Sequence, residues 1–230
     1  MTERNSEYAN EATALKFTSE KFGVELMVPN KADIGLLERH ELFIIEWLRD
    51  GIGIDIGACV GSVTLPFALR NQFNTVVAIE PQTNVFLCLL YNIHALHLRN
   101  VIPLNFAVSD RSGKIKLNIG KSTGHSSLLE TRFDGSLFLS SETVNAITVS
   151  EIVDLLHLRK IDWIKLDTEG YEHIILQSLD EICHKHQPDL IIEYHNNLDE
   201  VKKTLEHLKY RIDILKIDWE KHGWIKAVKG

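Results

Sequence analysis

The sequence has few cysteines, and they follow no pattern. Its 230 residues include three, which lie far apart at Cys59, Cys88 and Cys183. Such spacing matches no metal-binding motif, and three cysteines are too few for a disulfide framework. We therefore expect three small buried side chains and a reducing, cytoplasmic setting.

A basic charge and a long apolar run are also missing. The formal net charge is −7, whereas a nucleic-acid-binding protein normally carries a basic face that releases counterions from phosphates. No apolar run approaches the ~20 residues of a membrane span, and the polar residues 1–13 lack the apolar core of a signal peptide. The composition predicts neither a nucleic-acid nor a membrane partner, and it leaves the oligomeric state open.

Residues 51–69 do contain a strand, a glycine turn and a helix. A short apolar run, Ile52 to Ile56, carries an acid at Asp55 and ends in the turn Gly57-Ala58-Cys59-Val60-Gly61. Glycines in such a turn let a ligand approach the backbone closely, and the N-terminus of the following helix offers unpaired N–H groups. This unit predicts a ligand site.

The alternation of strands and helices continues along most of the chain. It is typical of an α/β fold with a doubly wound, mostly parallel sheet, and residues 210–230 predict an antiparallel hairpin. Strands are predicted at 52–56, 75–79, 101–108, 161–166 and 190–194, and helices at 63–69, 83–98, 150–158, 171–179 and 199–208.

Two regions depart from this alternation. Residues 1–50 predict a cap on a ligand-binding domain of residues 51–230, with a polar tail, short strands within 15–29 and a helix over 34–48. Residues 114–120 alternate like an edge strand, 121–141 form an irregular segment, and 146–149 form a short strand. His125, Ser126 and Ser127 in that segment belong either to a lid over the substrate or to a solvent-exposed loop.

Polar residues collect where the predicted strands end, which is where open α/β sheets bind ligands. Glu80 ends the second strand, 23 residues after Gly57. An acid at this position accepts both hydroxyls of a ribose, so a nucleoside ligand is expected. The other strand-end positions are the glycine turn, residues 107–110, residues 167–170 and His195.

The glycine turn discriminates between cofactors. Dinucleotide folds use G-x-G-x-x-G to reach a pyrophosphate, but here the pattern is Gly57-x-x-x-Gly61 with Asp55 two residues before it. A carboxylate there repels a pyrophosphate and suits a cofactor that ends in an amino acid with a positive amine. S-adenosylmethionine is such a cofactor.

With these residues in place, the sequence resembles the FkbM family of S-adenosylmethionine-dependent methyltransferases. The segments that carry the resemblance are VPN (28–30), DIGACVGSVT (55–64), AIEPQ (78–82), NFAVSD (105–110), ITVSEIV (147–153), IKLDTEGYE (164–172) and IIEYH (191–195). Cys59 departs from the family's usual DIGAN turn. The resemblance implies the seven-stranded class I methyltransferase sheet, whose last two strands form a reversed hairpin.

The resemblance also implies roles for individual residues. It places Asp55, Gly57, Ala58 and Gly61 at the methionine end of the cofactor, Glu80 and Pro81 at the ribose, and Phe106 and Ala107 beside the adenine. Asp167 and Glu169 would face the methyl group and the substrate. The implied substrate is a hydroxyl on a small molecule or carbohydrate, although a fold does not fix a substrate.

Methylation of a hydroxyl requires a proton acceptor, for which the candidates are Asp167, Glu169 and His195. Glu169 could instead stabilise a helix N-terminus, and His195 could be a hydrogen-bonded loop residue. Together with Glu193 these three could hold a divalent metal, but we expect none and expect a chelator to leave activity unchanged.

Two other functions stay open. One is N-methylation of a protein or nucleic acid, although DTEG at 167–170 differs from the N/D-P-P-Y/F turn that suits exocyclic amines. The other is nucleoside binding without catalysis.

Overall fold

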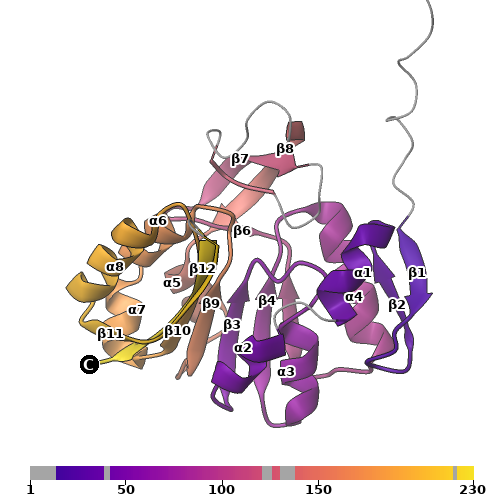
Figure 1. Cartoon of the computed structure of the whole chain (residues 1–230), viewed down its shortest axis with the longest axis horizontal. Helices are drawn as coiled ribbons and strands as arrows, with labels where there is room; N and C mark the ends of the chain where they lie inside the picture. Colours follow the sequence, from indigo (N-terminus) through magenta and orange to yellow (C-terminus); the bar gives the residue numbers. More distant parts are fainter. Residues whose placement is uncertain (1–13, 39–41, 121–125, 130–137, 220–221) are drawn as a thin grey trace, which may run out of the picture.

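The computed structural model describes residues 14–38, 42–120, 126–129, 138–219 and 222–230 (Figure 1). At its centre lies a seven-stranded sheet with the order β11-β12-β10-β9-β3-β4-β5. The five strands from β10 to β5 are parallel, and β12 pairs antiparallel with both β10 and β11. The strands are β3 (Ile52–Ile56), β4 (Thr75–Ile79), β5 (Val101–Leu104), β9 (Trp163–Leu166), β10 (Asp189–His195), β11 (Tyr210–Trp219) and β12 (His222–Lys229).

This topology confirms the predicted doubly wound α/β sheet with its C-terminal hairpin. Strand order reverses between β3 and β9, so the chain leaves the middle of the sheet in opposite directions on either side. Ligands of such sheets bind at the carboxyl ends of the strands beside that reversal.

Helices cover both faces of the sheet, which explains why the parallel strands are almost continuously apolar. One face packs against α5 (Val149–Leu155), α6 (Glu172–Gln177), α7 (Asp180–His186) and α8 (Leu198–His207). The opposite face packs against α1 (Ile34–Glu38), α2 (Leu42–Trp47), α3 (Thr64–Arg70) and α4 (Thr83–Ala95). Of these helices, α7 was not predicted, because its DEICHKH sequence has only two apolar residues.

The predicted strand over 101–108 is wrong in one respect, because it is divided between two sheets. β5 ends at Leu104, whereas β6 (Ala107–Val108) pairs with β8 in a small sheet of order β6-β8-β7. Asn105 lies at the break, where its side-chain amide donates to the backbone carbonyls of Glu80 (2.9 Å) and Pro81 (3.0 Å). These bonds turn the chain away from the main sheet.

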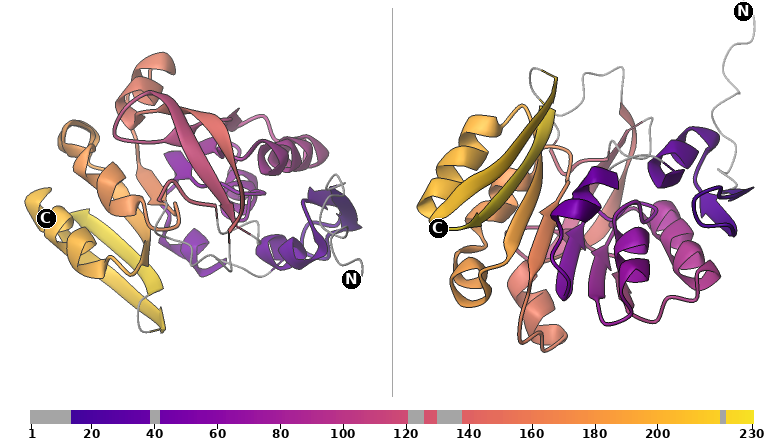
Figure 2. Two further views of the ribbon diagram at one scale, coloured as in Figure 1. Left: turned by 90° about the horizontal axis from the view of Figure 1, so that it is seen from above. Right: turned by 60° about the horizontal axis from the view of Figure 1, so that its bottom comes forward.

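The small sheet also corrects the irregular segment predicted for 121–141. β7 (Gly113–Gly120) is the expected edge strand, but its partner β8 (Phe138–Ile147) is far longer than the strand expected at 146–149. Most of β8 is exposed, and its polar run Ser140 to Thr143 interrupts the alternation that would reveal a half-buried strand. Figure 2, left, shows the small sheet lying over the end of the main sheet. Residues 121–125 and 130–137 are outside the described part.

The N-terminal segment packs onto the same core. The short strands expected within 15–29 are present as the hairpin of β1 (Leu15–Thr18) and β2 (Glu25–Val28), and η1 (Lys31–Asp33) leads into α1 and α2. Residues 39–41, inside the predicted helix 34–48, are not described. The buried Asn92 of α4 accepts from the Met27 N–H (2.7 Å) and donates to the carbonyls of Met27 (2.9 Å) and Val60 (3.0 Å). This side chain joins the hairpin to the glycine turn.

Within the described residues, no helix combines the length and the apolar character that a membrane span requires.

Candidate active site

The glycine turn after β3 is held tightly against the neighbouring strands. The N–H groups of Gly57 and Ala58 both donate to the carbonyl of Ile79 at 3.0 Å. Gly57 has a φ of +77°, and a Cβ there would lie 1.9 Å from the carbonyl oxygen of Asp167. A side chain at this position is therefore excluded, and the turn brings the ends of β3, β4 and β9 together.

A buried ion pair lies beneath the turn. Asp55 on β3 stands directly beside Lys165 on β9, with 3.2 Å between Oδ1 and Nζ, and both side chains are almost fully buried. Lys165 Nζ also donates to the Gly57 carbonyl (3.0 Å) and to Asp167 Oδ2 (3.3 Å), and Thr64 Oγ1 donates to Asp55 Oδ2 (2.6 Å). Lys165 thus links the turn to both acids.

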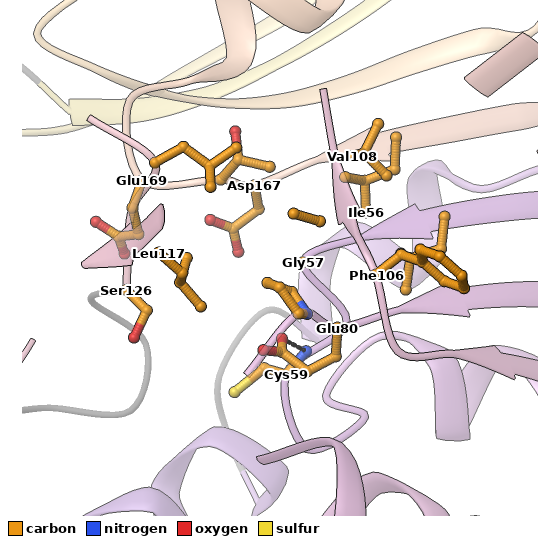
Figure 3. A pocket seen from close by; sticks show the side chains of 15 residues that line it. Ile56, Gly57, Cys59, Glu80, Phe106, Val108, Leu117, Ser126, Asp167 and Glu169 are labelled. Carbon is orange, nitrogen blue, oxygen red and sulfur yellow. Dashed lines mark hydrogen bonds between the residues drawn. The ribbon is translucent and has the colours of Figure 1, made fainter. Parts of the chain in front are cut away.

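A pocket opens at the carboxyl ends of the strands (Figure 3). It contains about 610 Å³ of empty space, counting the solvent at its mouth. Gly57, Cys59 and Glu80 form one side, and Asp167 and Glu169 lie across from Glu80. The remaining wall is largely apolar and is formed by Ile56, Ile79, Pro81, Phe106, Ala107, Val108, Leu117, Ser126, Leu128 and Thr168.

The pocket brings together most of the residues predicted to bind a cofactor. Gly57, Glu80, Pro81, Phe106, Ala107 and Asp167 all line it. Asp55, Ala58 and Gly61 are not among the residues that line the pocket: Asp55 lies beneath the turn and is 0% exposed, and Ala58, within the turn, is 1% exposed. The geometry gives these three a supporting position, so direct contact between them and a ligand stays a prediction.

Glu80 projects into the pocket from the end of β4. Its Oε2 accepts from the Cys59 N–H (3.0 Å) and its Oε1 from the Gln82 N–H (2.9 Å). Burial raises the pKa of Glu80 to about 7, although the two backbone hydrogen bonds and the Lys165 charge oppose this shift. The group therefore titrates near neutral pH.

The segment 126–129 passes over the pocket and is tied to its rim. Ser126 Oγ donates to Gln82 Oε1 (2.8 Å), and Ser127 Oγ donates to the carbonyl of Glu169 (2.8 Å). Ser126 and Leu128 line the pocket. These contacts support the predicted lid or substrate loop, whereas His125 falls outside the described residues.

The turn after β9 carries two of the three predicted proton acceptors, Asp167 and Glu169, and Glu169 has a strained backbone. Glu169 has a φ of +55°, a conformation that side-chain-bearing residues rarely adopt and that is often found at functional sites. Glu172 holds the turn in place, because its buried Oε1 accepts from the N–H groups of Thr168 and Gly170, both at 2.9 Å. Glu172 belongs to the family segment IKLDTEGYE, but its role in holding this turn was not predicted from the sequence.

The neighbours of Asp167 and His195 shift the pKa values of these two groups in opposite directions. Burial favours neutral Asp167, but the Lys165 ammonium, a hydrogen bond from Glu193 and the charge on His195 outweigh it and lower the pKa of Asp167. Burial favours neutral His195 as well, but the carboxylates of Glu172, Glu169 and Asp167 prevail and raise its pKa. Asp167 is therefore an anion and His195 is biased toward the cation.

His195 lies within a group of carboxylates. Its Nε2 is 3.6 Å from Glu169 Oε2 and 4.0 Å from Glu193 Oε2, and its Nδ1 is 3.3 Å from Glu172 Oε1. His222, on β12, contacts the Oε1 of Glu193 through its Nε2. Sequence reasoning placed His195 and Glu193 here but missed His222 and Lys165. A lysine inside the apolar strand IDWIKL was the available signal for Lys165, because a buried charge requires a partner.

The sheet order, the C-terminal hairpin and the strand-end pocket define the class I methyltransferase fold. A family model described as the methyltransferase FkbM domain matches residues 55–212. The chain therefore belongs to the FkbM family of methyltransferases. A search of curated protein sequences finds no match.

Solved structures with the same fold have distant sequences. Methyltransferase FkbM from Methylobacillus flagellatus KT is 17% identical with a TM-score of 0.54, and the match covers 80% of this chain but 46% of that one. M. jannaschii TYW2 in complex with AdoMet is 14% identical with a TM-score of 0.51, covering 97% and 90%. Precorrin-6y C5,15-methyltransferase from Geobacter metallireducens GS-15 is 15% identical with a TM-score of 0.50, covering 82% and 86%.

The departure at Cys59 has a measurable consequence. Cys59 has a φ of +50°, a left-handed conformation that asparagine tolerates better than cysteine. Replacing Cys59 by asparagine should raise the free energy of unfolding by up to about 1 kcal/mol, as measured by urea denaturation. The matched control is Cys59→Ala, which removes the sulfur without this conformational advantage. An asparagine variant no more stable than the alanine variant would show that the turn is unstrained.

Proposed function

We propose that this methyltransferase transfers the methyl group of S-adenosylmethionine to a hydroxyl oxygen of a small molecule or carbohydrate. One observation carries the proposal: the Gly57 turn and Glu80 face Asp167 and Glu169 across a single pocket. The acid expected to bind the nucleoside, Glu80, and the acids expected beside the acceptor, Asp167 and Glu169, therefore line the same pocket.

The pocket suits the parts of this cofactor. Glu80 offers a carboxylate to the two ribose hydroxyls, and the apolar side chains of Ile79, Phe106 and Leu128 suit an adenine ring. The amino-acid end would lie at the Gly57 turn, where the buried Asp55 and Asp167 favour a cationic amine. When bound, S-adenosylmethionine supplies an electrophilic methyl group, whose bond to sulfur breaks as its bond to the acceptor oxygen forms.

The three candidate proton acceptors then take different roles. Lys165 keeps Asp167 ionised, so Asp167 is a weak base that serves to orient the acceptor and hold positive charge. His195 has both ring nitrogens against carboxylates, Nδ1 at 3.3 Å from Glu172 and Nε2 at 3.6 Å from Glu169, so it serves to position Glu169. Glu169, at the pocket wall beside His195, is the group that takes the hydroxyl proton.

The acceptor class follows from the surroundings of Glu169. A hydroxyl must lose its proton during methylation, and the Glu169 carboxylate at the pocket wall is placed to accept it. Segment 126–129 closes over the pocket through its bonds to Gln82 and Glu169, which favours a small acceptor over a folded macromolecule.

An acceptor screen tests this proposal. The purified chain is incubated with S-adenosylmethionine and pairs of acceptors that differ only in a hydroxyl or an amine, such as a sugar and its amino-sugar analogue. We expect S-adenosylhomocysteine release with the hydroxyl compounds and mass-spectrometric products methylated on oxygen. Methylation of the amines alone, or of RNA or protein supplied instead, would contradict the hydroxyl assignment.

A further inference from the structure

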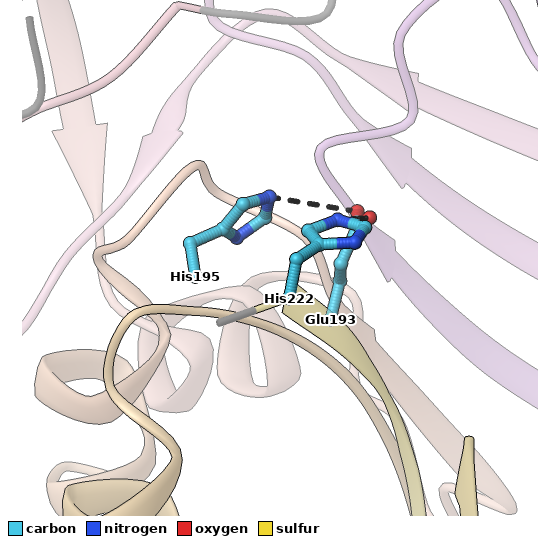
Figure 4. A group of neighbouring side chains, drawn as sticks. All are labelled: Glu193, His195 and His222. Carbon is cyan, nitrogen blue, oxygen red and sulfur yellow. Dashed lines mark hydrogen bonds and ion pairs between the residues drawn. The ribbon is translucent and has the colours of Figure 1, made fainter. Parts of the chain in front are cut away.

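Three side chains with metal-binding chemistry meet at one corner of the sheet. Glu193 and His195 lie two residues apart on β10, so they share one face of the strand. His222 on β12 stands directly opposite His195 in the antiparallel register, which places it on that face too. Figure 4 shows the carboxylate and the two imidazoles converging.

The donor atoms lie close enough to share one ion. One ligand atom from each of the three residues lies within 4.8 Å of the other two. His195 Nε2 is 4.0 Å from Glu193 Oε2, and His222 Nε2 contacts Glu193 Oε1. Glu193 and His195 are buried, with 5% and 7% of their surfaces exposed. The donors are thus fixed by packed strands.

A second carboxylate orients the first imidazole. His195 Nδ1 lies 3.3 Å from Oε1 of the fully buried Glu172, whose position is fixed by the N–H groups of Thr168 and Gly170. This contact leaves Nε2 directed at Glu193. Metal-bound histidines commonly place their other ring nitrogen against such a carboxylate, which sets the orientation of the ring.

The charge at this corner also favours a cation. Glu193 lies beside Asp167. Ile191 on β10 pairs with Lys165 on β9, and two residues further along each strand, on the same face, come Glu193 and Asp167. Two carboxyl groups in contact and shielded from water either share a proton or bind a cation. Asp167, Glu169 and His195 form a second, overlapping group of possible ligands.

We propose that Glu193, His195 and His222 bind a divalent first-row transition metal ion. Two imidazoles and one carboxylate suit Zn²⁺, Mn²⁺ or Fe²⁺, whereas Mg²⁺ prefers oxygen ligands alone. The sequence led us to expect no metal, because it did not show that His222 lies beside His195. The pairing of β10 with β12 places it there, and we therefore replace that expectation. The site borders Asp167 and Glu169, where the ion would hold the acceptor oxygen and ease loss of its proton. That catalytic role rests on the proposed function, but the binding of the ion does not.

Direct metal binding tests the site. The full chain is treated with a chelator, dialysed, and titrated with Co²⁺ while visible absorption is recorded, and with Zn²⁺ by calorimetry. We expect one ion per chain, and His222→Gln should weaken binding at least 10-fold. His207→Gln, an exposed histidine on α8, is the matched control and should bind as the wild type does. Wild-type binding no tighter than that of His222→Gln would overturn the proposal.

Further measurements separate the site from folding and from the proposed function. Glu193→Gln should also weaken Co²⁺ binding, and thermal melts of both variants should confirm that they fold. Glu80→Ala should leave Co²⁺ binding unchanged, so a failure of cofactor binding or hydroxyl methylation is distinguishable from failure of the metal site. If chelation leaves turnover of a hydroxyl acceptor unchanged, the catalytic role of the ion is overturned while its binding is judged by the titration.

Discussion

Replacing Glu80 by alanine should weaken S-adenosylmethionine binding by about 10²- to 10⁴-fold. By our proposal, the change removes two hydrogen bonds from the carboxylate to the ribose hydroxyls, each of which would contribute about 1.5–3 kcal/mol. Calorimetric titration measures the effect. Glu206→Ala removes an exposed glutamate on α8 and is the control, for which affinity should not change. A Glu80→Ala variant that binds within threefold of wild type would remove Glu80 from the cofactor site.

The pH dependence of the same carboxyl adds a second signature. Because burial raises the pKa of Glu80 to about 7, the folded protein binds more protons than the unfolded chain between about pH 4.5 and 7. Stability from this group is therefore present at acid pH and is lost as the pH rises through 7. Cofactor affinity should change in the opposite sense and fall below pH 7, where the ionised acceptor disappears. Glu80→Gln should flatten both profiles.

Replacing Glu169 by glutamine should lower turnover by about 10²- to 10⁴-fold, which is the usual contribution of a general base. Glutamine keeps the length of the side chain but cannot accept the hydroxyl proton. The affinity for S-adenosylmethionine should change little, since Glu80 and the Gly57 turn remain. Single-turnover rates and calorimetric affinities measure the two quantities separately.

Two comparisons show whether the proton acceptor is correctly assigned. Glu181→Gln, at an exposed position of α7, should keep full turnover. Asp167→Asn should weaken both the affinity for S-adenosylmethionine and turnover. The variant loses the negative charge that Lys165 stabilises on Asp167 and that we propose attracts the cationic amine of the cofactor. If Asp167→Asn abolished turnover while Glu169→Gln kept it, the proton acceptor would be Asp167.

The strands at the centre of the sheet could be predicted from the sequence because their signal is local. β3 and β4 have the predicted bounds, 52–56 and 75–79. Both are short runs that helices bury on both faces, so nearly every residue of the run is apolar and the run itself predicts the strand. β8 could not be predicted, because its apolar residues do not alternate along the strand and its exposed half is defined only by pairing with β7.

The candidate site divides in the same way. Glu80 and Asp167 could be placed because each follows a predicted strand, and the ends of parallel strands meet at one edge. Phe106 lay inside the predicted strand 101–108 and was placed by the family resemblance alone. Lys165 and His222 could not, because their partners are fixed by register between distant strands, Asp55 with Lys165 and His195 with His222. A shift of one residue in either pairing would turn these side chains to the opposite face. Only the folded sheet determines that alignment.

Calorimetric titration of the purified chain with S-adenosylmethionine, and separately with NADH, tests the central claim most directly. We expect S-adenosylmethionine to bind with one molecule per chain, and NADH to give no heat of binding, because the Asp167 carboxylate, which lines the pocket beside the Gly57 turn, repels a pyrophosphate. Binding of NADH without binding of S-adenosylmethionine would contradict the cofactor site described for this pocket.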